Sequence, residues 1–201
     1  MPQKLDVVVV PNGPLKVSGV SKMSYCGKPV DKEGTVLLCR CGQSKKAPFC
    51  DASHREPAFN GESPAIAQKA LVVWEGQRLR TRFNPNTCMH VFYCKPLKQL
   101  RERELGGDLE AAQEIAKVIA TCPSGALTYE AKGDFEAEPL LARDVEIDIV
   151  EGGEVRIQCA FDINAELPQS MHAERATLCR CGSSKNKPWC DGRHKAKKNF
   201  L

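Results

Sequence analysis

Cysteine and histidine occur in this sequence at spacings that suit metal ligation. Two segments each carry the pattern Cys-x-Cys-x8-Cys-x3-His. Thiolates and imidazole are ligands for zinc and for iron-sulfur clusters, and a Cys-x-Cys pair is too close for a disulfide of ordinary geometry. The sequence therefore predicts two metal sites. Their ligands are Cys39, Cys41, Cys50 and His54 in the first segment, and Cys179, Cys181, Cys190 and His194 in the second.

The two segments are copies of one repeat. Residues 38–54 and 178–194 are identical at 11 of 17 positions, at an offset of 140 residues. Upstream of each motif, two apolar runs around a glycine-containing turn predict a β-hairpin, and a third short strand leads into the cysteines. Within the motif, Gly42 and Gly182 permit a tight turn, and Asp51 and Asp191 predict the N-cap of a helix that carries the histidine.

The pattern Cys39-x-Cys41-x2-Ser44-x3-Pro48-x-Cys50-Asp51-x2-His54 and its second copy resemble the CDGSH iron-sulfur domain of the mitoNEET family. The resemblance implies a 2Fe-2S cluster in each copy, with the first two cysteines on the inner iron and the third cysteine and the histidine on the outer iron. The copies read Cys-Asp-Ala-Ser-His and Cys-Asp-Gly-Arg-His, whereas the family name records Gly and Ser before the histidine. Neither departure touches a ligand.

A histidine ligand has chemical consequences for such a cluster. It is neutral where a thiolate is negative, and replacing cysteine by histidine raises the reduction potential. Protons also compete with the metal for the imidazole, which leads to the hypothesis that acid releases both clusters.

A third group of cysteines lies between the copies. Cys122 precedes Pro123, as in ferredoxins, and Cys88 and Cys94 lie upstream. The segment 82–130 is similar to the divergent single-cluster ferredoxin domains found beside CDGSH motifs. Val91 occupies the position where a fourth cysteine is expected, which favours a 3Fe-4S cluster at Cys88, Cys94 and Cys122. A 4Fe-4S cluster with a non-cysteine ligand such as His90, or a degenerate site of buried cysteines, are the alternatives.

The strands and the helix expected around these residues indicate an α+β protein. We expect two small β-rich modules, residues 1–62 and 138–201, that form a pseudo-twofold unit and pair their strands with each other. A ferredoxin-like α+β domain, residues 63–137, lies between them. In it the pattern predicts strands at 69–74 and 126–129, and a helix capped by Asp108 with one apolar face. That face comprises Leu109, Ala112, Ile115, Ala116 and Ile119.

Composition narrows the function classes. The net charge of +4 is too small to indicate nucleic-acid binding, and no apolar run reaches the roughly 18 residues of a membrane span. Eleven cysteines, an odd number in close pairs, favour a reducing compartment, and we expect the cytoplasm. His172 lies in a polar segment and is expected in solvent, and Cys26 and Cys159 are expected to be core residues.

The leading hypothesis is a non-enzymatic protein of electron transfer or cluster transfer. Its partners would be redox proteins or apo-acceptor proteins, and the chain would be a monomer with an internal pseudo-dimer. No phosphate-binding loop or catalytic triad accompanies the metal motifs. The alternative is a structural zinc-binding interaction module, since three cysteines and a histidine also suit zinc.

Overall fold

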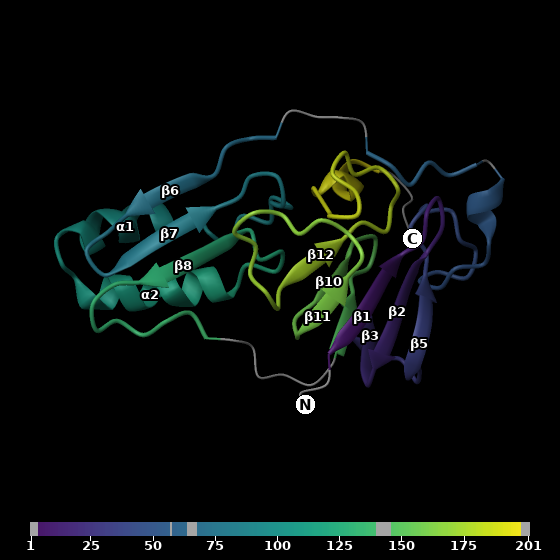
Figure 1. Ribbon diagram of the computed structural model, residues 1–201, viewed down its shortest axis with the longest axis horizontal. Helices are drawn as coiled ribbons and strands as arrows, with labels where there is room; N and C mark the ends of the chain where they lie inside the picture. Colours follow the sequence, from purple (N-terminus) through teal and green to yellow (C-terminus); the bar gives the residue numbers. More distant parts are fainter. Residues whose placement is uncertain (1–3, 57, 64–67, 140–145, 198–201) are drawn as a thin grey trace.

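The computed structural model describes residues 4–56, 58–63, 68–139 and 146–197. Within these residues the chain forms three β-sheets and two α-helices, which makes it a mixed α+β protein. Two of the sheets lie together at one end of the molecule, and the third sheet lies with both helices at the other end (Figure 1). No helix in the described part of the chain has the length and apolar character needed to cross a membrane.

The first sheet has the strand order β11-β1-β2-β5. Its strands β1 (Leu5–Val9), β2 (Leu15–Val20) and β5 (Gly34–Leu38) come from the first copy of the repeat and pair antiparallel. The fourth strand, β11 (Phe161–Ile163), comes from the second copy and runs parallel to β1. The first sheet is therefore completed by a strand from the other copy.

The second sheet mirrors this exchange, in the order β12-β10-β9-β3-β4. The second copy supplies β9 (Glu146–Ile149), β10 (Val155–Ile157) and β12 (Ala176–Leu178). The first copy supplies β3 (Lys22–Tyr25), parallel to β9, and the short edge strand β4 (Lys28–Pro29). In each copy, the strand that follows the hairpin therefore joins the sheet of the other copy. The predicted pairing of strands between the copies is present.

One apolar core holds the two sheets together. Alternation along β1 and β10 turns Leu5, Val7, Val155 and Ile157 inward, as expected for strands with one buried face. Each fully buried aliphatic side chain contributes about 1.5–3 kcal/mol relative to an exposed one. The core draws on both copies and contains Leu5, Val7, Leu15, Val17, Val20, Met23, Val36, Leu38, Ile147, Ile149, Val155, Ile157, Cys159, Ala176, Leu178 and Trp189.

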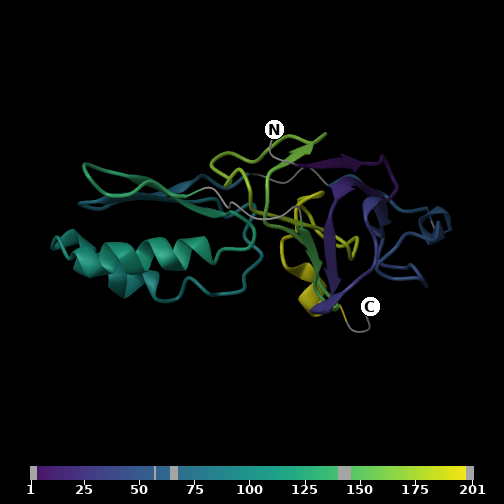
Figure 2. The same cartoon turned by 90° about the horizontal axis from the view of Figure 1, so that it is seen from below.

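The middle domain has two layers. Strands β6 (Val72–Glu75), β7 (Leu79–Phe83) and β8 (Leu127–Ala131) form an antiparallel sheet, and helices α1 (Leu97–Leu105) and α2 (Leu109–Ala120) cover one of its faces (Figure 2). Asp108 caps α2 as predicted, because its side chain accepts a hydrogen bond from the Ala111 backbone at 3.0 Å.

Of the five residues predicted for the apolar face of α2, three are buried, one is half-buried and one is exposed. Ala112, Ile115 and Ile119 are buried and Ala116 is half-buried, whereas Leu109, the first residue of the helix, is exposed. Ala111 is buried in its place. The predicted boundary between residues 62 and 63 lies just before residues 64–67, which are outside the described residues.

Candidate metal centres

Strand β5 delivers the chain into the first cysteine loop. The sulfurs of Cys39 and Cys41 lie 3.6 Å apart in the core, and Cys50 Sγ lies 3.5 Å from Nδ1 of His54. The second copy repeats this arrangement. Cys179 and Cys181 have sulfurs 3.9 Å apart, and Cys190 Sγ lies 3.4 Å from His194 Nδ1. In each motif the four donor atoms therefore form two close pairs.

The separations inside each pair suit two ligands on one metal ion. Metal–ligand bonds of about 2.0–2.3 Å at tetrahedral angles place neighbouring donors roughly 3.4–3.8 Å apart. A single zinc ion would draw all four donors of a motif this close together. Among the described residues, however, the only three metal-ligating side chains whose donor atoms all lie within 4.8 Å of one another are Glu154, Cys190 and His194. The four donors of a motif are therefore arranged as two close pairs and do not gather into one compact group.

The pKa values of the thiols in these motifs are shifted in both directions, and a hydrogen bond with Cys179 lowers the pKa of Cys181 to about 6. Burial raises the pKa of Cys41 to about 11 and that of Cys190 to about 12. Without a metal, both thiols therefore keep their protons at neutral pH. Metal binding must displace these protons, which couples loading of the sites to pH.

The two cysteine loops cross where the two copies of the repeat meet. Cys41 and Cys181 form an antiparallel β-bridge between the copies. The next residues, Gly42 and Gly182, have φ of 75° and 73°. A Cβ at Gly42 would lie 2.6 Å from the carbonyl oxygen of Cys181, and one at Gly182 would lie 2.8 Å from that of Cys41. Glycine is therefore required at both positions by backbone conformation and by close approach.

Each loop is braced by its own side chains. Ser44 Oγ donates to the Phe49 carbonyl at 2.6 Å. Asp51 accepts from the backbone N–H groups of Ser53, at 3.0 Å, and Lys45, at 2.8 Å. A hydrogen bond with the Ser53 side chain, together with these backbone bonds, holds the pKa of Asp51 well below its usual range. The helix that carries His54 is a single 3-10 turn, Ser53–Arg55, whose N-cap residue is Ala52. Asp51 therefore ties the loop together across the motif, and its predicted N-cap role is wrong.

The sequence analysis missed two buried arginines, one between the first two cysteines of each motif. Arg40 donates to the carbonyls of Gly13 at 2.9 Å and Val10 at 2.8 Å, which fixes the β1–β2 turn beneath the cysteine loop. Burial lowers the pKa of Arg40, and the nearby Cys179 of the other copy opposes this shift. Arg180 occupies the equivalent place in the second copy. The signal was available in the Cys-Arg-Cys sequence shared by both copies.

The three middle cysteines, Cys88, Cys94 and Cys122, line one cavity at the end of the middle domain. Burial raises the pKa of Cys88, and the charges of Cys122 and Cys94 raise it further, so the three thiols lie within electrostatic reach of one another. His90 lies beside them, with Nδ1 3.8 Å from Cys88 Sγ. His90 adopts a positive φ of 54°, which marks a tightly wound loop.

The middle domain covers the second metal module. Lys195 Nζ donates to the carbonyls of Met89 at 2.9 Å and His90 at 2.7 Å, in the loop between Cys88 and Cys94. Gly192 lies against the same loop, where a Cβ would be 2.4 Å from the Met89 oxygen. The first copy carries Ala52 at this position with a similar φ of 70°. The difference between the two motifs at this residue thus follows from contact with the middle domain.

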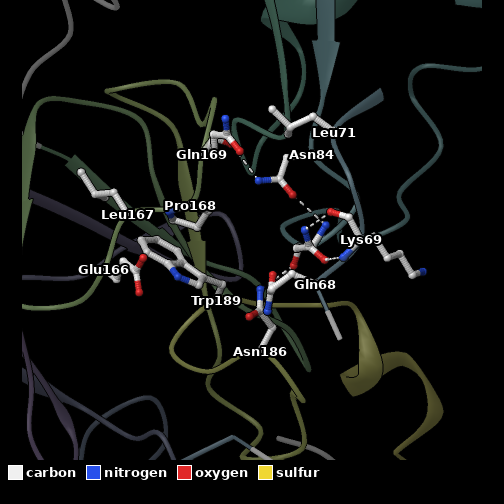
Figure 3. A pocket seen from close by; sticks show the side chains of 11 residues that line it. Gln68, Lys69, Leu71, Asn84, Glu166, Leu167, Pro168, Gln169, Asn186 and Trp189 are labelled. Carbon is white, nitrogen blue, oxygen red and sulfur yellow. Dashed lines mark hydrogen bonds between the residues drawn. The ribbon is translucent and has the colours of Figure 1, made fainter. Parts of the chain in front are cut away.

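A polar pocket lies along the same interface (Figure 3). Asn84 Nδ2 donates to the Gln169 carbonyl at 2.8 Å, and Asn186 Nδ2 donates to the Asn86 carbonyl at 2.5 Å. Both bonds join the middle domain to the second copy. The remaining cysteines, Cys26 and Cys159, lie outside the three groups, half-buried and buried respectively.

Two further interface residues were missed or misjudged. The prediction that His172 is solvated is wrong, since its side chain is buried against the middle domain. Arg175 is buried as well and donates to the carbonyls of Ile119 and Leu127 and to the carboxylate of Glu138. These contacts join segments far apart in the chain, and no local pattern marks them.

The fold and the sites together define a protein with two strand-exchanged metal modules and a three-cysteine domain beside them. Residues 12–55 and 139–195, just over half of the chain, match the family described as iron-binding zinc finger of CDGSH type. Residues 74–132 match the family described as divergent 4Fe-4S mono-cluster. The chain therefore belongs to the CDGSH iron-binding family and carries two such modules that flank a mono-cluster domain. Comparisons with curated proteins and with solved structures found no match.

Proposed function

We propose that the chain binds a 2Fe-2S cluster in each CDGSH module, through three cysteines and one histidine, and acts in electron transfer or cluster transfer. The observation that carries this proposal is the division of each ligand set into two pairs with internal separations of 3.4–3.9 Å. Two metal positions per motif suit a binuclear cluster and argue against a single structural zinc ion. When bound, such clusters accept and release single electrons.

The middle site is proposed to hold a third cluster on Cys88, Cys94 and Cys122. In a 4Fe-4S cluster the four cysteine ligands each hold one iron. His90 lies 3.8 Å from the sulfur of Cys88, a separation that suits two ligands on the same iron. His90 is therefore a poor fourth ligand in this conformation. A 3Fe-4S cluster, or a 4Fe-4S cluster with a fourth ligand from outside the chain, fits the three thiols.

The expected partners are redox proteins or apo-acceptor proteins rather than small substrates, and the chain is proposed to have no enzymatic activity. Lys45 and Lys46 are exposed beside the outer ligands of the first module and would favour an acidic partner surface. The eleven free thiols suit a reducing compartment such as the cytoplasm. The internal strand exchange supports a monomer with a pseudo-dimer inside one chain.

Metal and sulfide analysis of the anaerobically purified chain tests the proposal. We expect a coloured protein with about four irons from the CDGSH modules, and about seven or eight if the middle site is loaded. Removing Cys88, Cys94 and Cys122 together should lower the count to about four irons without altering the CDGSH contribution. A colourless protein that contains zinc and no labile sulfide would contradict the proposal and favour the structural zinc module.

A further inference from the structure

The two CDGSH sites differ in how deeply their outer ligands are buried. Cys50 and His54 of the first site are half-buried, whereas Cys190 and His194 of the second are only 2% and 8% exposed. The first ligand loop also borders a surface hollow lined by Gln43, Lys45, Asp51, Ala52, Ser53, Arg55 and Glu56. The first site therefore opens to solvent, and the second lies against the middle domain.

A buried carboxylate adds a second difference. Glu154, which is 1% exposed, places Oε2 3.5 Å from Nε2 of His194. The other ring nitrogen, Nδ1, faces Cys190, so the imidazole is aligned between the cysteine and the carboxylate. Arg156 fixes the opposite oxygen of Glu154 with a hydrogen bond of 2.7 Å. This chain of arginine, glutamate and histidine is the arrangement by which carboxylates orient metal-bound histidines.

In the described part of the structure, the first site has no equivalent of this arrangement. The Val10 N–H donates to the Pro14 carbonyl at 3.1 Å, and the Val150 N–H donates to the Glu154 carbonyl at 3.0 Å. Pro14 therefore occupies the backbone position of Glu154. No acidic side chain of the described residues forms an ion pair with His54.

We propose that Glu154 is a positioning residue that holds His194 toward its metal, so that the second site retains its cluster and the first site is the one that gives its cluster up. This inference rests on the proposed function and assigns different roles to the two modules. Carboxylates behind a histidine ligand commonly strengthen metal binding by 10–100-fold, and burial of the ligands restricts access of competing ligands.

Cluster loss from the full-length, fully loaded chain tests the inference. An iron chelator is added at constant pH, and the visible absorbance is followed in time. We expect a fast and a slow phase for the two CDGSH sites. Cys50→Ala should abolish the fast phase and Cys190→Ala the slow one, while any phase from the middle site persists in both. Loss from the second site first, or equal rates at both sites, would overturn the inference without any further variant.

Substitution of Glu154 then separates positioning from simple burial. Glu154→Gln should accelerate the slow phase about 10-fold or more and leave the fast phase unchanged. It should also raise the reduction potential of the second cluster, because a neutral amide replaces a carboxylate, and Glu154→Asp should restore part of both effects. Glu151→Gln, in the same turn but exposed, is the matched control.

The outcomes distinguish the inference from the function on which it rests. If Glu154→Gln and Glu151→Gln lose cluster at the same rate and keep the same potentials, Glu154 has no positioning role. A chain that contains no iron and no sulfide contradicts the proposed function itself. A loaded chain that loses both CDGSH clusters together contradicts only the inference.

Discussion

Burial governs the chemistry of His172, a single residue outside every metal site. Its backbone N–H donates to the Gly125 carbonyl at 3.1 Å, and its Nδ1 accepts from the Glu174 N–H at 3.1 Å. Burial lowers the pKa of His172 to about 4, and the charge of Arg175 acts in the same direction. The imidazole is therefore neutral in the folded protein at neutral pH and resists protonation as the pH falls.

We expect His172 to make the interface sensitive to acid. The pKa of His172 is lower in the folded than in the unfolded state. The contribution of neutral His172 to the free energy of unfolding is therefore complete above about pH 6.5 and is lost as the pH falls from about 6.5 to about 4. At pH 5 the loss is about 2 kcal/mol of unfolding free energy. Denaturant unfolding of the loaded chain at pH 7 and pH 5 measures it. His172→Asn, which keeps an acceptor near Nδ1, should remove this part of the pH dependence, and an unchanged dependence would contradict it.

The residues that could be identified from the sequence have roles set by nearby residues in the chain, and those that could not have roles set by distant residues. The eight cysteines and histidines of the CDGSH motifs could be proposed as ligands from the sequence because their chemistry and spacing are local. His172, Arg175 and Glu154 were not, because their roles depend on which distant segments pack against them. Comparison of the two copies did not point to Glu154 either, since the equivalent residue of the first copy is Pro14.

At the scale of elements, the crossing of the two cysteine loops constrains the fold. Gly42 and Gly34 both have positive φ, 75° and 78°, but only Gly42 faces a close neighbour. No atom lies within 4 Å of a Cβ placed at Gly34. The pair therefore separates the cost of a left-handed backbone from the cost of close approach.

Gly42→Ala should destabilise the protein more than Gly34→Ala. The left-handed conformation costs about 1–2 kcal/mol in both variants, and the clash with the Cys181 carbonyl adds to it only in the first. Chemical denaturation monitored by circular dichroism gives both values. Equal losses would mean that the crossing adjusts freely and that glycine serves only the turn.

Elements with strong local signals were predicted, and those set by distant contacts were not. The hairpins and the cap of α2 follow from alternation and from Asp108. Strand β7 and helix α1 were missed, and α1 buries only Leu97, Leu100 and Glu104, which is too few apolar positions for a clear period. The buried Glu104 accepts from the Gln77 and Arg78 backbone, a contact with a separate turn.

The whole molecule is less symmetric than its repeat. The loop between Cys88 and Cys94 contacts the ligand loop of the second module through Met89, and Gly192 permits that contact. The equivalent Ala52 of the first module has a similar backbone conformation and instead lines a surface hollow. Among the described residues, this loop therefore joins the middle domain to the second module.

Gly192→Ala should loosen this attachment. A Cβ 2.4 Å from the Met89 oxygen requires the loop to move, at a cost of about 1–3 kcal/mol. Hydrogen exchange of residues 88–94, measured by mass spectrometry on the loaded chain, should accelerate. Ala52→Gly is the matched control and should leave the exchange of these residues unchanged. Equal protection in the Gly192→Ala variant and the parent chain would show that the contact does not hold the loop.

The strand exchange has a consequence for biogenesis. As the chain leaves the ribosome, residues 5–54 appear early, but their sheet lacks β11 until residue 163 has been made, and Cys41 meets Cys181 later still. Domains generally fold as units during synthesis, N-terminal first, yet here neither half is a complete unit. We therefore expect iron and sulfide to be inserted only after both copies of the repeat have been synthesised, because each CDGSH module depends on contacts with the other.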